Sequence, residues 1–513
     1  MAAPTIFETC QPREDILRGA VTDADFAADL ASVLSGAGSP AYADPARFFA
    51  NTYPTRGLRN LLANVCRRLG GAGGEAAAIF RLDTSYGGGG KTHGLIALVH
   101  AARGIRGVAD ASEFLDPSLP PAGKVRVAAF DGENADPANG RALGDGVLAY
   151  TPWRQIAYAL AGVPGYERVR KSDEMRAAPG AGTLQELFGG EPTLILLDEL
   201  SVYLRKVRRL DDARDQLTTF LTSLFKAIEN APNAALVYTL AIGKGDGGAP
   251  DAYSEENRFI ADQMAEAESV SARKATLLNP TADDETIQVL RRRLFESIDP
   301  DAAAEVAGDY RKLWSAHADS LPTSANPSSN AETFAASYPL HPEVLETLTG
   351  KTATLATFQR VRGMLRLLAR TVGQLWEEPP DDAAAIHLHH IDPGHEPIRQ
   401  EILTRLGQDA YAPAIANDIA GPAGRRSLAQ EIDAAHHGGC RRTRSTRRGP
   451  SSCIRSRSTS RSRGWLPTNC AIPCSVRRWT SASSRKGARS SSPSPPTWTT
   501  GPPRRCASWP RRT

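Results

Sequence analysis

The chain has few cysteines, methionines and aromatic residues: 7 Cys, 4 Met and 6% aromatic residues in 513. Only Cys10 and Cys66 lie before residue 440, and no two cysteines have the C-x-x-C spacing. Counting therefore excludes a disulfide framework or a structural zinc site in this part of the chain. The hydrophobic content of 41% still suffices for apolar cores, and the length predicts roughly two to four domains.

Long apolar runs are also absent. The longest uncharged apolar stretch, Ala234–Gly243, is about half of what a membrane-spanning helix needs. Met1–Leu17 carries acidic and basic side chains in place of the basic start and apolar run of a signal peptide. We therefore expect a soluble, cytoplasmic protein with no membrane partner.

Acidic residues are missing from one end of the chain. Residues 441–513 hold 17 Arg and one Lys but no Asp or Glu, whereas residues 1–440 hold 43 basic and 57 acidic residues. The formal net charge of +4 therefore hides an acidic body and a basic tail. The tail also holds 16 Ser and 9 Pro but only four Leu, Ile, Val or Phe residues, so we expect it to be disordered.

The sequence leaves two interpretations of this tail open. Arginines interleaved with Trp465, Trp479, Trp498 and Trp509 are typical of a nucleic-acid tether whose affinity depends strongly on salt. A GC-rich gene read out of frame gives the same excess of Arg, Ser, Pro, Cys and Trp. We favour this second interpretation because a tail selected for binding more often carries Lys. On that reading residues 441–513 are out-of-frame translation, and the native C-terminal region is missing.

Hydrophobic periodicity divides the body into three regions. Residues 1–75 are predicted to be a helical N-terminal region, because residues 23–34 and 55–69 place apolar side chains at three- and four-residue spacing. In residues 76–248, apolar runs of strand length alternate with helix-period or Gly/Pro-rich segments; the runs are Ala77–Leu82, Val125–Phe130, Thr193–Leu197 and Ala235–Leu240. This alternation predicts an α/β core, a parallel sheet with helices on both faces.

After Gly248 we expect no further strands. Helical periodicity in Glu285–Ile298, Pro342–Leu348 and Thr357–Trp376 predicts a helical lid domain at residues 249–440.

The strongest motif is the Gly-rich segment Ser85-Tyr-Gly-Gly-Gly-Gly-Lys91-Thr92, which stands between a predicted strand and a predicted helix. Glycine tolerates the positive φ that turns backbone N–H groups toward a polyphosphate, and the helix directs its positive N-terminal end at the anion. The alternative is a flexible linker, and the usual P-loop has Gly where Ser85 stands. Because strand and helix both flank the segment, we favour a P-loop NTPase core that binds nucleotide through Gly87, Gly88, Gly89, Gly90, Lys91 and Thr92.

A second motif is the apolar run from Thr193 that ends in Asp198 and Glu199. A carboxylate at the end of a buried strand beside a phosphate loop suits a Mg²⁺ shell, and a second carboxylate can deprotonate the attacking water. We therefore expect Thr92 and Asp198 to bind Mg²⁺, Lys91 to contact the β- and γ-phosphates and Glu199 to act as the base. A strand that ends in solvated acids is the plainer alternative. ATP is favoured over GTP because the chain has no Asn-Lys-x-Asp motif.

Further catalytic candidates are less specific. Thr239, on a strand expected between the two motif strands, is either a third contact to the γ-phosphate or water, or an ordinary buried threonine. A charge-neutralising arginine is also expected, although most helical arginines are simply solvated. The candidates lie on two predicted helices: Arg291, Arg292 and Arg293 on one, and Arg360, Arg362 and Arg366 on the other.

Six stretches together resemble a known family: Cys10–Asp15, Phe48–Thr55, Gly87–His93, Leu194–Glu199, Ser337–Pro342 and Phe358–Gly363. They are similar to large prokaryotic AAA-type ATPases, long catalogued only as a domain of unknown function, whose genes often lie beside DNA methyltransferases and helicases in phage-defence islands. The resemblance covers about residues 8–435. It implies an ATPase core with a helical lid, in which Arg360 or Arg362 serves as a lid-borne sensor.

The resemblance implies a function in which ATP hydrolysis drives or gates a DNA-modification or restriction assembly. DNA-methyltransferase or helicase proteins are then the expected partners, contact with DNA is indirect, and a homo-oligomer is compatible with an arginine acting across subunits. Two alternatives stay open. One is a nucleotide-dependent scaffold or switch with little turnover; the other is nucleic-acid tethering through the basic tail.

Overall fold

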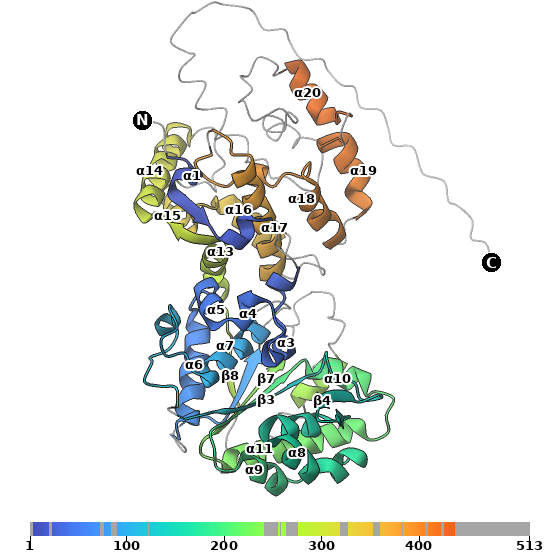
Figure 1. Cartoon of the computed structure of the whole chain (residues 1–513). Coiled ribbons are helices and arrows are strands. Elements are labelled where there is room, and N and C mark those ends of the chain that lie inside the picture. The colour runs from blue at the N-terminus through green and yellow to red at the C-terminus, as the bar shows by residue number, and fades with distance from the viewer. Residues whose placement is uncertain are drawn as a thin grey trace, which may run out of the picture. The chain divides into compact units, whose positions relative to one another are not determined.

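The structure is a computed structural model. It describes residues 4–19, 23–71, 76–83, 90–121, 123–240, 255–256, 258–262, 275–318, 327–351, 360–381, 383–405, 409–421 and 425–436 (Figure 1). The predicted loop glycines Gly87, Gly88 and Gly89 and the tail at 441–513 lie outside these residues. No helix among the described residues is long and apolar enough to cross a membrane.

A five-stranded parallel sheet forms the centre of the α/β region. Its strand order is β3-β6-β7-β2-β8, with β2 (Ile79–Asp83), β3 (Arg126–Asp131), β6 (Thr193–Asp198), β7 (Ala234–Leu240) and β8 (Thr276–Leu278). The four strands predicted from apolar runs are confirmed, and β7 lies between β6 and β2 as expected.

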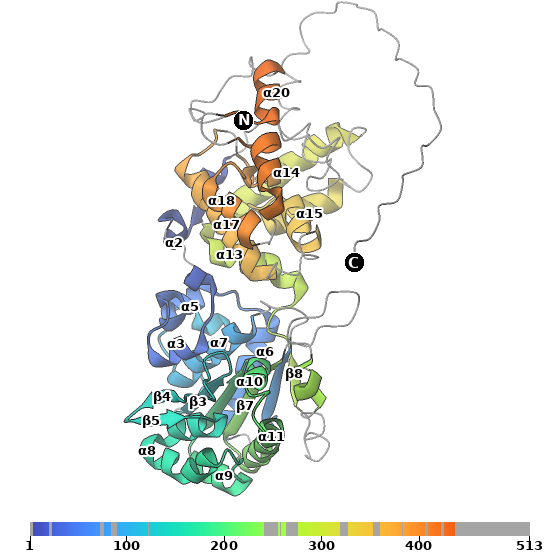
Figure 2. The ribbon, with the colours of Figure 1, turned by 90° about the vertical axis from the view of Figure 1, so that its right-hand side faces the viewer.

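Helices cover both faces of this sheet, and β6 shows why its sequence is continuously apolar. Leu194 and Leu196 pack with α6 (Arg56–Leu69) and α7 (Lys91–Arg103). Ile195 and Leu197 alternate with them and face the other way. There they pack with α8, α9 and α11 (Figures 1 and 2), whose bounds are Pro152–Glu174, Ala181–Phe188 and Ala213–Asn230.

The expectation that strands end before residue 249 is wrong. β8 joins the sheet beside β2, and β9 (Phe295–Ile298) pairs antiparallel with β1 (Cys10–Pro12). The helix expected over Glu285–Ile298 is therefore shorter: α13 spans Thr286–Leu294, and the chain then continues as β9.

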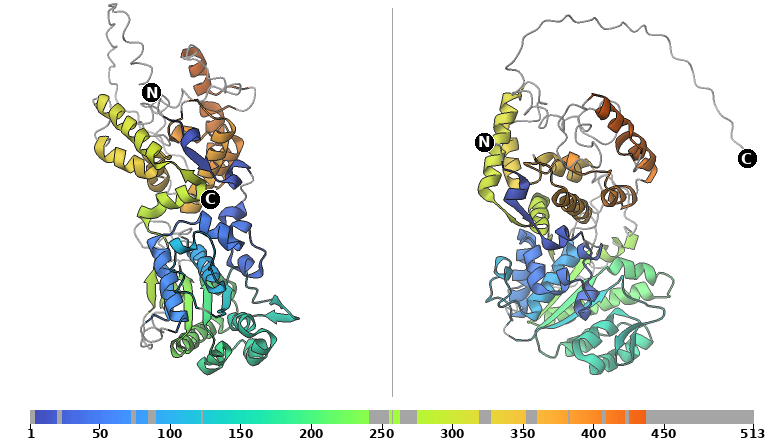
Figure 3. Two further views of the ribbon diagram at one scale, coloured as in Figure 1. Left: turned by 60° about the vertical axis from the view of Figure 1, so that its left-hand side comes forward. Right: turned by 45° about the horizontal axis from the view of Figure 1, so that its top comes forward.

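A second apolar core is helical, as predicted for this region. Buried side chains of α13 to α17 build it; the last four of these helices are α14 (Pro300–Ala316), α15 (Pro327–Ser337), α16 (Pro342–Glu346) and α17 (Arg360–Glu377). Ile6, Cys10, Ile16 and Phe26 belong to the same core. In Figure 3 the blue N-terminal elements accordingly lie beside the yellow and olive helices.

The predicted N-terminal helical region is thus divided between the two cores. Its α3 (Leu30–Ser35), α5 (Pro45–Asn51) and α6 pack on the sheet side. The described residues 4–19 and 23–26 instead contribute Ile6, Cys10, Ile16 and Phe26 to the helical core, and they include strand β1. A helix expected over residues 23–34 is interrupted after a 3₁₀ turn at Asp23–Phe26. The remaining elements are α1 (Ile6–Thr9), α2 (Glu14–Leu17), α4 (Pro40–Ala43), β4 (Arg141–Gly144), β5 (Val147–Ala149), α10 (Leu200–Lys206), α18 (Glu396–Gln400), α19 (Ala412–Ala414) and α20 (Leu428–His436).

Candidate functional site

The order of strands marks one place on the sheet as a candidate ligand site. From β2 the chain crosses to β3 at one edge, returns through β6 to β7, and then passes over β2 to β8 at the other edge. In open parallel sheets ligands bind beyond the carboxyl ends of strands where the winding reverses. Here that point lies at the ends of β2 and β7, where β2 leads toward the N-terminus of α7.

Three of the predicted site residues meet at Asp198. This carboxylate, at the end of β6, is 2% exposed. The Thr92 hydroxyl in α7 donates to its Oδ2 over 2.8 Å, and the Thr239 hydroxyl in β7 donates to its Oδ1 over 2.5 Å. Residues more than a hundred positions apart in the chain therefore converge on one buried acid.

The N-terminal end of α7 begins with Lys91. Gly90 precedes it with φ +78°, in the left-handed region that glycine adopts without strain, and its carbonyl accepts the N–H of Gly94 over 2.9 Å. The charge of Lys91 lowers the pKa values of Asp198 and Glu199 from what burial alone would give. The helix end and its lysine together favour an anion at this position.

Glu199 follows Asp198 in an unusual backbone conformation. Its φ of +51° and ψ of +39° are left-handed, which is uncommon for a residue with a side chain. Its N–H donates to Asp198 Oδ1 over 3.1 Å, and it caps the start of α10. Gly132 makes this turn possible, because a Cβ there would lie 2.0 Å from the carbonyl oxygen of Glu199.

Burial raises the pKa values of both acids. For Asp198, burial is opposed by the two threonine hydroxyls and by Lys91. For Glu199, burial and the neighbouring Asp198 charge raise the pKa from 4.5 to about 7. A carboxyl group with such a pKa can take up a proton near neutral pH, as a general base requires.

Sequence reasoning missed Asp131. It ends β3, in register with Asp198, and its charge raises the pKa values of Asp198 and Glu199. Its own oxygens accept the N–H of Glu133 over 2.8 Å and the side-chain amide of Asn134 over 2.7 Å. An acid directly after an apolar run was the available signal, since Asp198 was identified by the same pattern.

Residues 7–273 match the DUF499 N-terminal domain, and residues 281–427 match the DUF499 second domain. The chain belongs to the DUF499 family. No curated protein and no solved structure matches it. These two matches confirm the expected resemblance to an uncharacterised domain family.

The first group of candidate arginines, in the DUF499 second domain, is held by contacts within the chain. Arg291 donates to the carbonyl of Ala336 over 2.9 Å, Arg292 forms ion pairs with Asp110 and Glu113, and Arg293 forms one with Asp15 over 2.7 Å. Contacts within the chain thus engage all three arginines of this group.

The arginines of α17 are also placed in part. Arg362 donates from Nε to the carbonyl of Phe26 over 2.7 Å, and Arg366 pairs with Glu401 over 2.8 Å. The side chain of Arg360 lies outside the described residues, although its backbone begins α17. A role for Arg360 or Arg362 at the site remains a prediction.

The donor set of this DUF499 site fits Mg²⁺. Thr92 and Asp198 supply hydroxyl and carboxylate oxygens, which are the hard ligands that this ion prefers. Asp131 and Glu199 add negative charge that a divalent cation would neutralise. No group of three or more His, Cys, Asp or Glu side chains suited to a metal occurs in the part of the chain that the structure describes.

The pKa of Glu199 predicts a pH-dependent difference in stability. In the unfolded chain this group ionises near 4.5, but in the folded chain only near 7, so the folded state loses stability as pH rises through this window. The wild type should therefore lose about 1–3 kcal/mol in free energy of unfolding between pH 4.5 and pH 8 relative to Glu199→Gln, because glutamine does not titrate. Urea denaturation at both pH values measures it. The exposed-site control Glu191→Gln should show no such difference from wild type, and equal pH profiles for Glu199→Gln and wild type would contradict the assigned shift.

Proposed function

We propose that this DUF499 protein binds ATP with Mg²⁺ and hydrolyses it. The observation that carries the proposal is the convergence of Thr92, Asp198 and Thr239 beside Lys91 and Glu199, at the point where the sheet winding reverses. On this proposal residues 76–248 are a P-loop core.

In this proposal the phosphates lie at the N-terminus of α7. Lys91 contacts the β- and γ-phosphates, and the backbone N–H groups of Gly87, Gly88, Gly89 and Gly90 surround the chain of phosphates. Thr92 and Asp198 hold Mg²⁺, which neutralises charge on the phosphate oxygens when it is bound. The hydrogen bond between Thr92 and Asp198 supports this role, because it places both oxygens at one point.

Glu199 is the proposed base for the attacking water. Its pKa near 7 supports this role, and the αL turn directs the residue away from the regular course of β6. On this proposal Thr239 orients that water or the γ-phosphate; its hydrogen bond to Asp198 supports the role. We propose that Arg360 or Arg362 completes the charge balance, from the same chain or from a neighbouring copy in a homo-oligomer.

The resemblance to AAA-type ATPases of phage-defence loci supports a wider proposal. Hydrolysis then drives or gates a DNA-modification assembly whose partners are DNA-methyltransferase or helicase proteins. The chain's contact with DNA in such an assembly is indirect.

The test measures nucleotide and metal together. The full chain should bind a fluorescent ATP analogue in Mg²⁺ and release phosphate from ATP, and Asp198→Asn should reduce the Mg²⁺-dependent part of the affinity by about tenfold. The control Asp136→Asn changes an exposed loop acid and should leave that affinity intact. Absence of binding by wild type would overturn the proposal. Binding without steady-state phosphate release would favour the switch instead.

A further inference from the structure

The turn Asn279–Glu285 joins β8 to α13 and lies where the two family domains meet. It is seated directly on the start of α6. A Cβ at Gly57 would lie 1.8 Å from the carbonyl oxygen of Asn279, so the two backbones touch with no room for a side chain.

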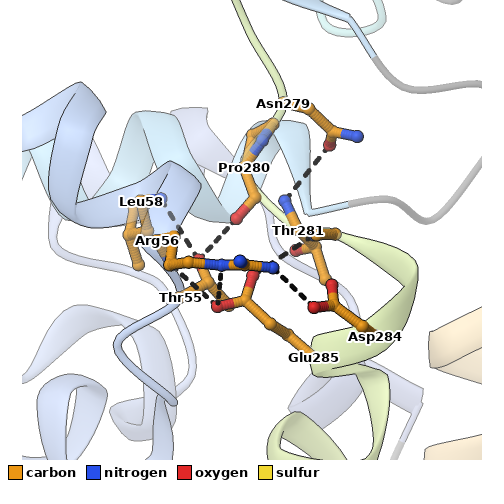
Figure 4. Close-up of polar contacts among 9 residues, drawn as sticks. Thr55, Arg56, Leu58, Asn279, Pro280, Thr281, Asp284 and Glu285 are labelled. Carbon is orange, nitrogen blue, oxygen red and sulfur yellow. Dashed lines mark hydrogen bonds and ion pairs between the residues drawn. The ribbon is translucent and has the colours of Figure 1, made fainter.

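Thr55 makes the first polar link (Figure 4). Its hydroxyl donates to the carbonyl of Pro280 over 2.5 Å and accepts the N–H of Leu58 over 3.1 Å. The residue therefore caps α6 and holds the turn with the same oxygen. Loss of the hydroxyl would release both.

Arg56 and Glu285 make the second link. The backbone N–H of Arg56 donates to Glu285 Oε1 over 2.9 Å, and the other carboxylate oxygen accepts the N–H of Ala282 over 3.4 Å. The Arg56 guanidinium also pairs with Asp284 over 2.6 Å, but both side chains are about two-thirds exposed, so this pair contributes little. Glu285 is only 8% exposed, and its carboxylate joins the turn to the start of α6.

Thr281 is the residue of the turn that lies beside the candidate nucleotide site. Its hydroxyl lies 3.1 Å from the position of a Cβ at Gly90, the residue that precedes Lys91. The first residue of the matched second domain thus lies beside the residue that precedes α7.

A second route runs through α5. Arg13 and Arg292, whose neighbours pack in the helical core, both donate to the carbonyl of Ala50, over 2.6 and 2.9 Å. Two residues on, the Thr52 hydroxyl donates its one hydrogen to the carbonyl of Phe48 over 2.6 Å. The Thr52 oxygen also lies 2.9 Å from Nε2 of His93, so in this hydrogen bond Nε2–H donates and the Thr52 oxygen accepts. His93 directly follows Thr92 in α7.

The far end of the turn enters the helical core. α13 begins at Thr286, and its Leu290 and Leu294 are fully buried in that core together with α17. A displacement of the turn would therefore move packed side chains of α13, since close-packed interiors transmit small shifts.

We propose that the turn Asn279–Glu285 couples occupation of the α7 N-terminus by a nucleotide to the helical second domain. This rests on the proposed function. Phosphates bound at the start of α7 would restrain Gly90 beside Thr281, and Thr55 and Glu285 would carry that restraint into α13. The same residues make the coupling reciprocal, so a partner that holds the second domain would change nucleotide affinity.

The experiment is hydrogen exchange of the full chain, with and without Mg²⁺ and a non-hydrolysable ATP analogue. In wild type, exchange in peptides from α13 and α17 should slow by about fivefold or more when the analogue binds. Thr281→Val, which keeps the side-chain volume, and Glu285→Ala, which frees the turn, should each lose more than half of that response while the analogue still binds. The matched control Thr219→Val, on the exposed side of α11, should keep it.

The outcomes separate the two proposals. If wild type fails to bind the analogue, the proposed function is overturned, and the coupling with it. If it binds and α13 and α17 do not respond, only the coupling is overturned. A full response in both Thr281→Val and Glu285→Ala would show that the turn is not the route.

Discussion

Replacing Glu199 with glutamine is expected to leave ATP bound but to slow phosphate release by about 10²-fold or more. The amide keeps the size and the hydrogen-bonding oxygen of the side chain, so the αL turn over Gly132 persists. It cannot accept a proton from water, which the carboxylate with its pKa near 7 can do.

Lys91→Ala provides the contrasting result. It removes the positive charge at the start of α7, so ATP binding and turnover should be lost together. Fluorescence titration and a steady-state phosphate assay, run on wild type and both variants, make the comparison, with Glu191→Gln as the matched control. Normal hydrolysis by Glu199→Gln would show that another group activates the water.

The central strands could be predicted from sequence for a physical reason. Each of the four predicted strands is a nearly continuous apolar run, because it lies inside the sheet or is covered on both faces. These strands are β2, β3, β6 and β7. β8 gave no such signal. It has three residues, Leu277 is 57% exposed, and its strand conformation depends on pairing with β2.

Tertiary contacts explain the other differences. Residues 1–75 are predicted to be helical from the periodicity of residues 23–34 and 55–69, but periodicity does not say which core a segment joins. Ile6 and Cys10 pack with the helical second region, and Thr9 contacts the Tyr338 hydroxyl over 2.5 Å. Arg292 likewise looked free on a helix, whereas its partners Asp110 and Glu113 come from a loop far away in the chain.

The motif residues of the candidate site could be predicted from the sequence, but the neighbouring residues that hold them in position could not. Thr92, Asp198 and Glu199 stand in local patterns that chemistry explains. Asp131 follows an apolar run as Asp198 does, but its pairing with Asp198 depends on strand register, and Gly132 acts through close approach to the Glu199 carbonyl, which no local pattern encodes.

Gly132→Ala should disable the site without touching any group that is proposed to bind ATP. The new Cβ would lie 2.0 Å from the Glu199 carbonyl oxygen and 3.0 Å from Cβ of Tyr203. Neither atom can move away by a side-chain rotation. We expect the variant to lose about 1–3 kcal/mol in free energy of unfolding through overpacking. Displacement of Glu199 by about 1 Å should also lower phosphate release by roughly 10²-fold.

Gly182→Ala is the matched control for this substitution. Gly182 lies within α9, and a Cβ there would meet nothing within 4 Å, so the change should stabilise the helix by about 0.5–1 kcal/mol and leave hydrolysis intact. Denaturation measures stability, and the phosphate assay is run at a temperature where both variants are folded. If Gly132→Ala hydrolyses ATP at the wild-type rate while folded, the αL turn at Glu199 does not position the base. Since the atoms of Glu199 nearest to the added Cβ are its carbonyl carbon and oxygen, a selective loss of turnover would trace the effect to that turn.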